Sequence, residues 1–289
     1  MSTDFSGQVV VVTGAGRGIG RATALSLGER GAAVVVADLD DAVCAEVVSA
    51  IEASGGKAKG VAASVADWAA AERIVDTAVR GFGRIDALIN NAGYLARSPI
   101  WELTPEDFEA QVRVHLFGTY NCTRHAVTHM MAQGYGRIVN VISRAGLVGA
   151  ENSSAYAAGK GGTFGFTNSI ARDLVGTGVN VNAFNPAATS TRLVFDNQTQ
   201  ETIDRMKSVV QEPEHVAAVA TYLASRACDF SGQSFYVEAG AVSPFPVFTP
   251  DRTAFTNGMW TPEELAEIMP KFKFPALAKS LYVNPTNKA

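Results

Sequence analysis

The stretch Gln8-Val-Val-Val-Val-Thr-Gly-Ala-Gly-Arg-Gly-Ile-Gly20 decides the fold of this 289-residue chain. Its run of valines predicts a buried β-strand, because a short β-branched run that ends in a turn fits a strand covered on both faces. The glycines predict a tight turn, and residues 21–30 then alternate apolar and polar side chains at helical period. Strand, glycine turn and helix in this order are typical of the first unit of a parallel α/β sheet.

The glycine turn has the composition of a dinucleotide-binding turn. Its glycines allow the backbone to approach a pyrophosphate, which the free N–H groups at the start of the helix would bind. A second β-branched run, residues 33–37, leads to Asp38, about 20 residues after the glycines. A carboxylate there can accept hydrogen bonds from ribose hydroxyls and would repel a 2′-phosphate, which favours NAD over NADP. Arg17 argues the other way, since a basic side chain in the turn is one means of binding that phosphate.

The same alternation continues along the chain. Further strands are expected at residues 57–62, 85–89, 137–142, 179–184 and 233–237. Thr104 as N-cap and Pro105 in the first turn predict a helix that runs to about residue 133. Strands that alternate with helices predict an α/β fold, a single doubly wound parallel-sheet Rossmann domain.

Three residues near the middle of the chain could perform acid–base chemistry. Ser143 follows the strand expected at 137–142, and Tyr156 lies four residues before Lys160. On a helix, residues four apart share one face, so the phenol and the ammonium would point into the same volume. A nearby cation lowers the pKa of a phenol from about 10 towards the working pH, where a general acid or base is most useful. The serine hydroxyl could then hold a substrate oxygen.

Composition excludes several classes of partner. The chain has 28 Asp and Glu against 24 Lys and Arg and no basic block, which argues against nucleic acid or an anionic membrane. It shows no secretory leader and no apolar run of about 20 residues, so we expect a cytoplasmic protein. Cys44, Cys122 and Cys228 have no metal-binding spacing and are expected to be reduced core thiols. His125 and His129 lack an acidic third ligand at matching spacing, so no metal site is expected.

Together these features resemble the short-chain dehydrogenase/reductase family, over about residues 9–240. The resemblance rests on the glycine turn, Asn90-Asn-Ala-Gly93, a serine thirteen residues before Tyr156-x-x-x-Lys160, and Asn185-Pro186 before Thr191. It implies that Tyr156 is the acid/base and that Ser143 orients the substrate oxygen. It also implies that Lys160 binds the nicotinamide ribose and lowers the pKa of the phenol, while hydride passes between the substrate carbon and nicotinamide C4.

The resemblance further implies a set of cofactor-binding residues, with NAD as the expected cofactor. Within it, Ser64 and Val65 would lie beside the adenine, and Thr191 would contact the nicotinamide carboxamide. The set comprises Gly14, Arg17, Gly18, Ile19, Gly20, Asp38, Ser64, Val65, Asn91, Ala92, Gly93, Tyr156, Lys160, Pro186, Ala188 and Thr191.

Three positions depart from the family pattern. His115 stands where the catalytic tetrad usually has an asparagine, and Ser64 and Ala187 replace the usual aspartate and glycine. If the asparagine acts mainly through its backbone carbonyl, which supports a water next to the lysine, histidine is tolerable and His115 belongs to the catalytic set. This Val-His-Leu variant is similar to the hydroxyacyl-CoA dehydrogenase units of peroxisomal multifunctional enzymes and to bacterial dehydrogenases of sterols and side-chain acyl-CoAs.

The chain extends beyond the usual end of the family. Residues 1–240 are expected to form the catalytic domain, and residues 241–289 a C-terminal extension that packs over the cleft or on a neighbouring subunit of a homodimer or homotetramer. In that extension, Thr261-Pro-Glu-Glu264 predicts the start of a short helix. The polar segment 191–211 is predicted to be a substrate lid.

The expected activity is the NAD-dependent interconversion of a secondary alcohol and a ketone. A bulky ring or aryl alcohol and a (3R)-hydroxyacyl-CoA remain alternative substrates. Arg97, Arg144 and Arg192 could border a CoA site, whereas the aromatic-rich tail suits an apolar substrate. A non-catalytic NAD-binding scaffold is a remote alternative, which the presence of both Tyr156 and Lys160 disfavours.

Overall fold

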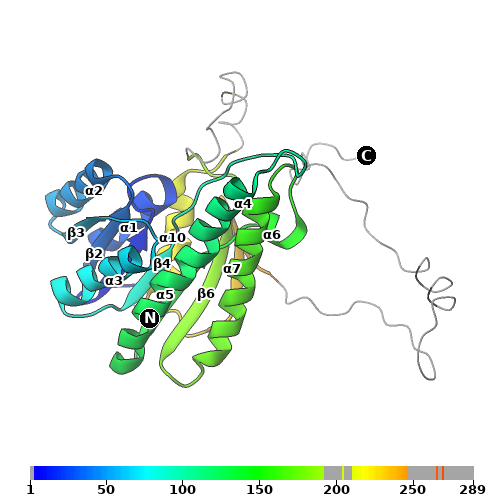
Figure 1. Cartoon of the computed structure of the whole chain (residues 1–289). Coiled ribbons are helices and arrows are strands. Elements are labelled where there is room, and N and C mark those ends of the chain that lie inside the picture. Colours follow the sequence, from blue (N-terminus) through cyan, green and yellow to red (C-terminus); the bar gives the residue numbers. More distant parts are fainter. Residues whose placement is uncertain (1–2, 192–203, 205–209, 246–264, 266–268, 270–289) are drawn as a thin grey trace, which may run out of the picture. The chain divides into compact units, whose positions relative to one another are not determined.

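The computed structural model describes residues 3–191, 204, 210–245, 265 and 269 (Figure 1). The chain divides into two units, Met1–Pro244 and Phe245–Ala289, and all elements named below belong to the first unit. Its strands form one eight-stranded sheet in the order β3-β2-β1-β4-β5-β6-β7-β8. The predicted α/β Rossmann fold is therefore confirmed.

Seven of the eight strands pair in parallel, as the sequence predicts. The last strand runs antiparallel to its neighbour, and the sequence did not predict it. It is exposed at all four positions, so it has no burial pattern that periodicity could detect. The expected domain boundary at residue 240 falls inside this hairpin. The strands are β1 (Val9–Thr13), β2 (Ala33–Asp38), β3 (Lys57–Ala62), β4 (Ala87–Asn90), β5 (Gly136–Val141), β6 (Val179–Pro186), β7 (Ser234–Glu238) and β8 (Ala241–Pro244).

The helix expected from Thr104 onwards is present, but a π-helical turn interrupts it. Thr104 caps its start, because its hydroxyl accepts a hydrogen bond of 3.1 Å from Asp107 N–H. A short helix after β5 was not predicted. The helices are α1 (Gly18–Glu29), α2 (Asp41–Ala53), α3 (Trp68–Phe82), α4 (Pro105–Val112), the π turn η1 (Arg113–Phe117), α5 (Gly118–Gln133), α6 (Ala145–Val148), α7 (Ser154–Asp173) and α10 (Pro213–Ala224).

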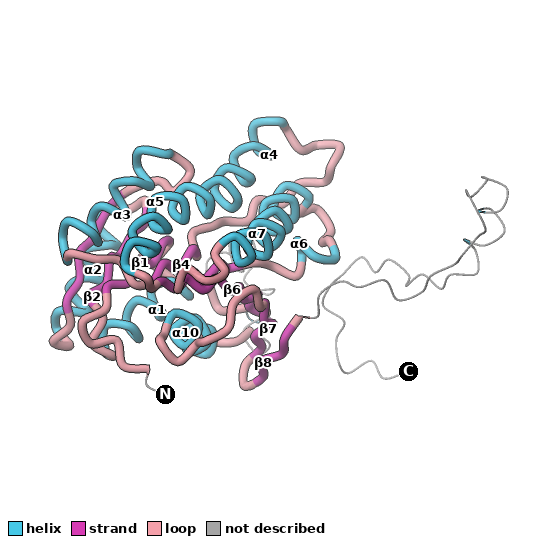
Figure 2. Tube along the Cα trace, turned by 90° about the horizontal axis from the view of Figure 1, so that it is seen from below, coloured by secondary structure: helices cyan, strands magenta, loops and turns pink. Residues whose placement is uncertain are grey.

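Helices cover both faces of the sheet, and β1 shows how the sequence specifies this. Val10 and Val12 pack in one core with α1, α2 and α10, whereas Val9 and Val11 pack in a second core with α3 and α5. Figure 2 shows α1 and α10 on one side of the strands and α3, α5 and α7 on the other. Because both faces are covered, successive valines are all buried, which explains the continuous apolar run.

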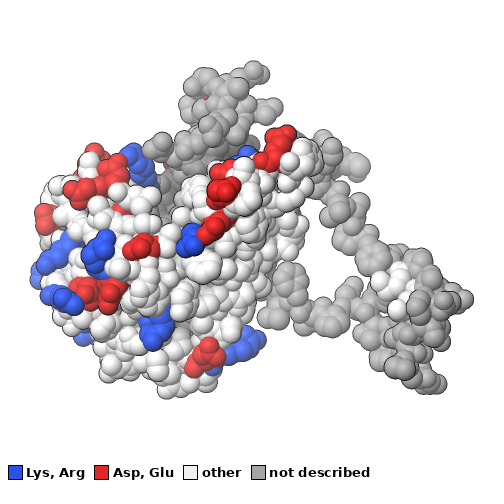
Figure 3. All heavy atoms as spheres, in the orientation of Figure 1, with Lys and Arg blue, Asp and Glu red and all other residues white. Residues whose placement is uncertain are grey.

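The remaining global expectations concern cysteines, charge and membrane segments. All three cysteines are buried and free. On the face drawn in Figure 3, the described Lys and Arg side chains lie interspersed with Asp and Glu. Of the helices in the described part of the chain, none has the length and apolar content that crossing a bilayer requires.

Candidate active site

The predicted site residues lie at the edge of the sheet where the parallel strands end. β1 lies between β2 and β4, so the strand order reverses direction at this point. Open α/β sheets bind ligands in the crevice outside the carboxyl ends of the strands at such a reversal. The glycine turn follows β1 and Asn91 follows β4, which places them on the two sides of this crevice.

The glycine turn packs tightly against the segment after β4 and against Thr191. Gly14 and Gly18 have positive φ angles of 61° and 51°. A Cβ atom at Gly14 would lie 2.8 Å from Ala92 Cα, and one at Gly18 would lie 2.8 Å from Thr191 Cγ2. Asn91 Nδ2 donates to the carbonyls of Thr13 and Gly14 at 2.9 and 3.1 Å. Only glycine fits these two positions, because Ala92 and Thr191 approach the backbone of the turn too closely for a side chain.

Asp38 ends β2 with its carboxylate fixed beside the glycine turn. Its Oδ2 accepts a hydrogen bond of 2.9 Å from Gly16 N–H, and its Oδ1 accepts one of 2.8 Å from Leu39 N–H. Asp38 is half-buried, and both of its carboxylate oxygens are anchored by backbone N–H groups. The Arg17 guanidinium lies 3.4 Å from Asp40 Oδ2, so its charge is directed to a neighbouring acid.

Tyr156 and Lys160 lie one turn apart on α7, as the spacing predicts. The Lys160 ammonium is 6.0 Å from the centroid of the Tyr156 ring and donates a 2.6 Å hydrogen bond to the carbonyl of Val141 at the end of β5. Tyr156 is half-buried and Lys160 is buried. Burial disfavours the ammonium and lowers the pKa of Lys160 to about 7. The Lys160 side chain, next to Tyr156, is therefore mainly charged below about pH 7 and mainly neutral above it.

Ser143 lies between β5 and α6, at the same edge. Its hydroxyl oxygen accepts a 3.2 Å hydrogen bond from Ala145 N–H at the start of α6. The next residue, Arg144, donates its N–H to Asn185 Oδ1 on β6 at 3.0 Å. The half-buried serine is thus held in a segment that is tied to two neighbouring strands.

His115 lies in the π turn η1 and contacts Tyr156 edge-on. The ring centroids are 5.0 Å apart and the rings are almost perpendicular. His115 Nε2 lies 2.7 Å from the carbonyl of Tyr94, which can only accept, so Nε2 carries the proton. Its Nδ1 is buried and has no partner within the described residues. Burial and the nearby Lys160 lower the pKa of His115 to about 3, so the imidazole is neutral at physiological pH.

Two threonine hydroxyls lie within hydrogen-bond distance of the backbone carbonyl of His115, and the sequence did not predict either contact. Thr119 Oγ1 donates to it at 2.7 Å. Thr163 Oγ1 has one proton and lies 3.1 Å from this carbonyl and 2.9 Å from the carbonyl of Gly159. The two threonine hydroxyls thus lie where the resemblance would expect a water at this carbonyl. Thr163 lies on α7, three residues after Lys160, and periodicity has no signal for such a contact.

The family model of short chain dehydrogenases matches residues 8–202, and a crystal structure of a short chain dehydrogenase from Mycobacterium avium superimposes with a TM-score of 0.82 and 34% identity, over 92% of this chain and 94% of that one. This chain belongs to the short-chain dehydrogenase family. The resemblance inferred from its motifs is therefore confirmed, and the chain is an oxidoreductase that acts on CH–OH groups.

Three curated relatives of this short-chain dehydrogenase have similar sequence identities to it, but their names state different activities. The 3-oxoacyl-[acyl-carrier-protein] reductase of Synechocystis sp. is 37% identical over 245 residues, 83% of this chain and 99% of the relative. Cyclohexanol dehydrogenase of Acinetobacter sp. is 35% identical over 244 residues, 83% and 97% respectively. Peroxisomal multifunctional enzyme type 2 of Mus musculus is 37% identical over 245 residues, 82% of this chain but 32% of that enzyme.

Short-chain dehydrogenases typically use NAD or NADP, and the residues of this chain fit a dinucleotide. The close packing of Gly14 against Ala92 and of Gly18 against Thr191 fixes the turn that leads into α1. The N-terminal end of α1, which follows, has no acidic residue in its first turn, so its partial positive charge is available for a pyrophosphate. When bound, the nicotinamide would supply the hydride donor or acceptor.

We expect His115→Asn to retain most of the activity of this short-chain dehydrogenase. Neither side chain titrates between about pH 5 and 9, because burial keeps the imidazole neutral. The variant loses the hydrogen bond from Nε2 to Tyr94, so its free energy of unfolding should fall by about 1 kcal/mol. Profiles of kcat against pH and thermal unfolding of both proteins test this, with His129→Asn on α5 as the control. A limb near neutrality that disappears only in the His115 variant would show a proton-transfer role instead.

Several expectations concern residues outside the described ranges, or sites elsewhere on the molecule. Arg192, most of the predicted lid and the helix predicted from Thr261 lie outside the described residues. Within the described ranges, no group of three or more His, Cys, Asp or Glu side chains could hold a metal ion.

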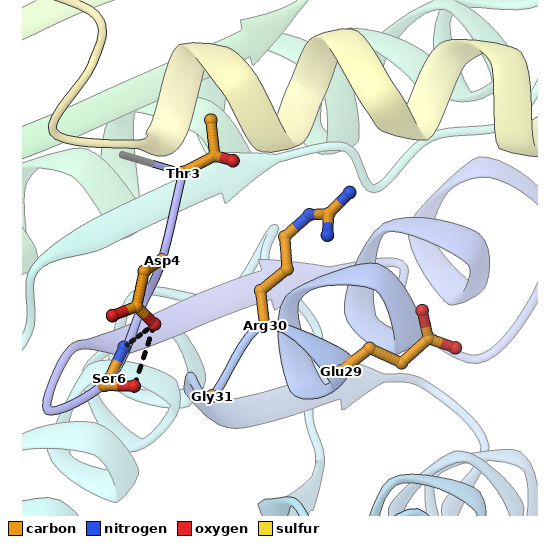
Figure 4. Close-up of a pocket in the computed structure, with 6 residues that line it drawn as sticks. All are labelled: Thr3, Asp4, Ser6, Glu29, Arg30 and Gly31. Atoms are coloured by element: carbon orange, nitrogen blue, oxygen red, sulfur yellow. Dashed lines mark hydrogen bonds between the residues drawn. The ribbon is translucent and has the colours of Figure 1, made fainter. Parts of the chain in front are cut away.

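The pocket in Figure 4 lies at the opposite edge of the sheet, because Ser6 precedes β1 and Gly31 precedes β2, so it does not belong to the candidate active site.

Proposed function

We propose that this short-chain dehydrogenase uses NAD to interconvert a secondary alcohol and a ketone on a bulky apolar, ring or aryl substrate. The observation that carries the proposal is that Tyr156 and Lys160 lie next to each other on α7. They lie at the edge of the sheet where β5 ends and Ser143 follows. This arrangement brings a proton donor, a titratable amine and a hydroxyl to one side of the crevice. A scaffold that only binds NAD would not need this set.

Each side chain has one task in the proposed reaction. Ser143 holds the substrate oxygen by hydrogen bonding, and the Tyr156 phenolate accepts the proton of the alcohol as the carbonyl forms. In the opposite direction the phenol returns that proton to the oxygen. Lys160, fixed by Val141, sets the charge beside the phenol. When bound, the cofactor would accept the hydride from the substrate carbon, so that one proton and one hydride are removed from the alcohol.

The preference for NAD rests on Asp38. Its carboxylate is held at the end of β2 by two backbone N–H groups, next to the turn that would bind the pyrophosphate. A fixed negative charge there repels a 2′-phosphate and accepts hydrogen bonds from ribose hydroxyls. Arg17, which could bind that phosphate, is paired with Asp40 instead.

We expect Asp38→Ala to raise kcat/KM with NADP relative to NAD by about tenfold, because a repulsion near 1.4 kcal/mol is removed. The variant should also lose about 1 kcal/mol in free energy of unfolding, since two N–H groups lose their acceptor. Kinetics with both cofactors and chemical denaturation test the two effects. Asp41→Ala, at the start of α2, is the control. A wild-type protein that already prefers NADP would contradict the assignment.

The preference for an apolar substrate rests on exposed apolar side chains at the same edge. Ile100 and Trp101, in the loop after β4, are 67% and 80% exposed, and Val148 at the end of α6 is 56% exposed. The two loops are joined, because Ser98 N–H donates to the carbonyl of Asn152 at 2.9 Å. Similarity to a cyclohexanol dehydrogenase supports a ring alcohol.

A (3R)-hydroxyacyl-CoA is the second candidate substrate. Arg97 and Arg144 are exposed on the same two loops, where they could bind the phosphates of CoA. Similarity to a 3-oxoacyl-[acyl-carrier-protein] reductase and to a peroxisomal multifunctional enzyme supports a thioester substrate.

A substrate panel decides between these candidates. Cyclohexanol, an aryl secondary alcohol and (3R)-3-hydroxybutyryl-CoA are each incubated with NAD or NADP, and the formation of reduced nicotinamide is followed. We expect the highest kcat/KM with a ring or aryl alcohol and NAD. A higher value with the thioester would select the second candidate, and binding of NAD without turnover of any alcohol would support the scaffold.

The proposal includes an assembly and a location. We propose a cytoplasmic homodimer or homotetramer, with the C-terminal extension over the cleft or on a neighbouring subunit. The apolar side chains exposed on the helices of the catalytic domain, such as Phe117 and Tyr120, favour assembly. Light scattering of the purified chain, with and without residues 245–289, tests the assembly and whether the extension takes part in it.

A further inference from the structure

Gln211 joins three separate segments at the carboxyl edge of the sheet. The residue is 6% exposed. Its Oε1 accepts a 2.5 Å hydrogen bond from Ala239 N–H in the turn between β7 and β8. Its Nε2 donates to the carbonyl of Val237 at 3.1 Å and to Thr189 Oγ1 at 3.3 Å. The hydrogen-bonding groups of this buried amide are therefore satisfied by β7, by the turn after it and by the segment after β6.

The backbone of Gln211 makes the same connection. Its N–H donates to the carbonyl of Ala188 at 3.0 Å, and its carbonyl accepts from Ser190 N–H at 2.8 Å. Thr189 and Gln211 thus form a parallel bridge, although 22 residues separate them. Both side chain and backbone fix the path that the chain takes after β6.

The turn that Gln211 supports is itself strained. Ala239 has a φ of 46°, a conformation that alanine rarely adopts. The hydrogen bond from its N–H to Gln211 holds it there, and the carbonyl of Val237 on β7 accepts from Gln211 Nε2. A single amide therefore couples the β7–β8 hairpin to the segment after β6.

That segment carries the proposed nicotinamide contacts. Pro186, Ala188 and Thr191 belong to the cofactor-binding set, and Thr191 reaches the glycine turn at Gly18. We propose that Gln211 is a positioning residue that holds residues 187–190 in the conformation needed for the nicotinamide half of the cofactor. This inference rests on the proposed function. Gln211 lies far along the chain from Asp38, which serves the adenosine half.

The test compares a whole dinucleotide with one that lacks the nicotinamide. Gln211→Met keeps the length of the side chain and removes its hydrogen bonds. In the full-length protein we expect the Kd of NAD to rise about tenfold, because the loss of one buried network costs near 1.4 kcal/mol, and the Kd of ADP-ribose to stay within about twofold of wild type. Gln233→Met is the matched control, because Gln233 is exposed and, within the described part of the chain, its Nε2 donates only to the carbonyl of Ser231.

Thr189→Val is a milder second variant of the same connection. It removes the hydroxyl that accepts from Gln211 and donates to Ala187 at 2.8 Å, so we expect a smaller rise in the Kd of NAD alone. The inference would be overturned if the Kd values of NAD and ADP-ribose rose equally. It would also be overturned if the melting temperature fell while both Kd values stayed unchanged. A wild-type protein that binds no NAD would overturn the proposed function as well, whereas unchanged variants would overturn this inference alone.

Discussion

Tyr156→Phe is expected to lower kcat by about 10²- to 10⁴-fold while the Kd of NAD stays nearly unchanged. The substitution removes only the phenolic hydroxyl, which is the group that exchanges a proton with the substrate oxygen. The aromatic ring stays, and with it the edge-on contact with His115 and the packing near Lys160. The loss should therefore affect the chemical step and not the fold.

Steady-state kinetics and NAD titration of the purified variant test this prediction. Tyr120→Phe is the matched control, because Tyr120 lies on α5 and contacts Phe166 and Trp68 on the helical face of the domain. A Tyr156 variant with a kcat within threefold of wild type would show that another group transfers the proton.

Lys160→Met is expected to lower kcat/KM by about 10²-fold, the lower end of what a group that tunes an acid or base contributes. The side chain is buried and donates a 2.6 Å hydrogen bond to Val141. Methionine has a similar length and needs no partner, so the core around it should remain packed. The variant loses the titratable charge next to Tyr156 and the proposed contact with the nicotinamide ribose.

The pH dependence of this variant separates the role of the charge from the role of packing. Burial lowers the pKa of Lys160 from 10.5 to about 7, so the wild-type profile of kcat/KM, which reports the free enzyme, should show an ionisation near pH 7. The Met variant should lack it. Lys57→Met, at the exposed start of β3, should keep it. An ionisation that persists in the Lys160 variant would belong to another group.

The same shift predicts how stability depends on pH. Between about pH 7 and 10.5 the unfolded chain binds a proton at Lys160 that the folded chain has released. The free energy of unfolding should therefore rise with pH across this window in the wild type, relative to Lys160→Met. Chemical denaturation at both ends of the window measures the difference, and parallel curves for the two proteins would contradict the low pKa.

Local patterns in the sequence determined the fold and most of the candidate site. The valines of β1 predicted a strand because both of its faces are covered, and Thr104 predicted a helix start because its hydroxyl caps a free N–H. Tyr156 and Lys160 share a face of α7 because four residues make about one helical turn. These features depend on neighbours in the chain, so periodicity and residue type were sufficient to predict them.

Contacts between distant segments were decided only by the tertiary structure. Thr163 binds the carbonyl of His115 across 48 residues, and Lys160 finds its acceptor in Val141 on another element. Gln211 joins β7 to the segment after β6, although nothing in its own neighbourhood marks it as buried. Which atoms meet depends on how helices cross the sheet and on the register of its strands. The pKa of Lys160 has the same origin, because the residues that remove its water come from other elements of the fold.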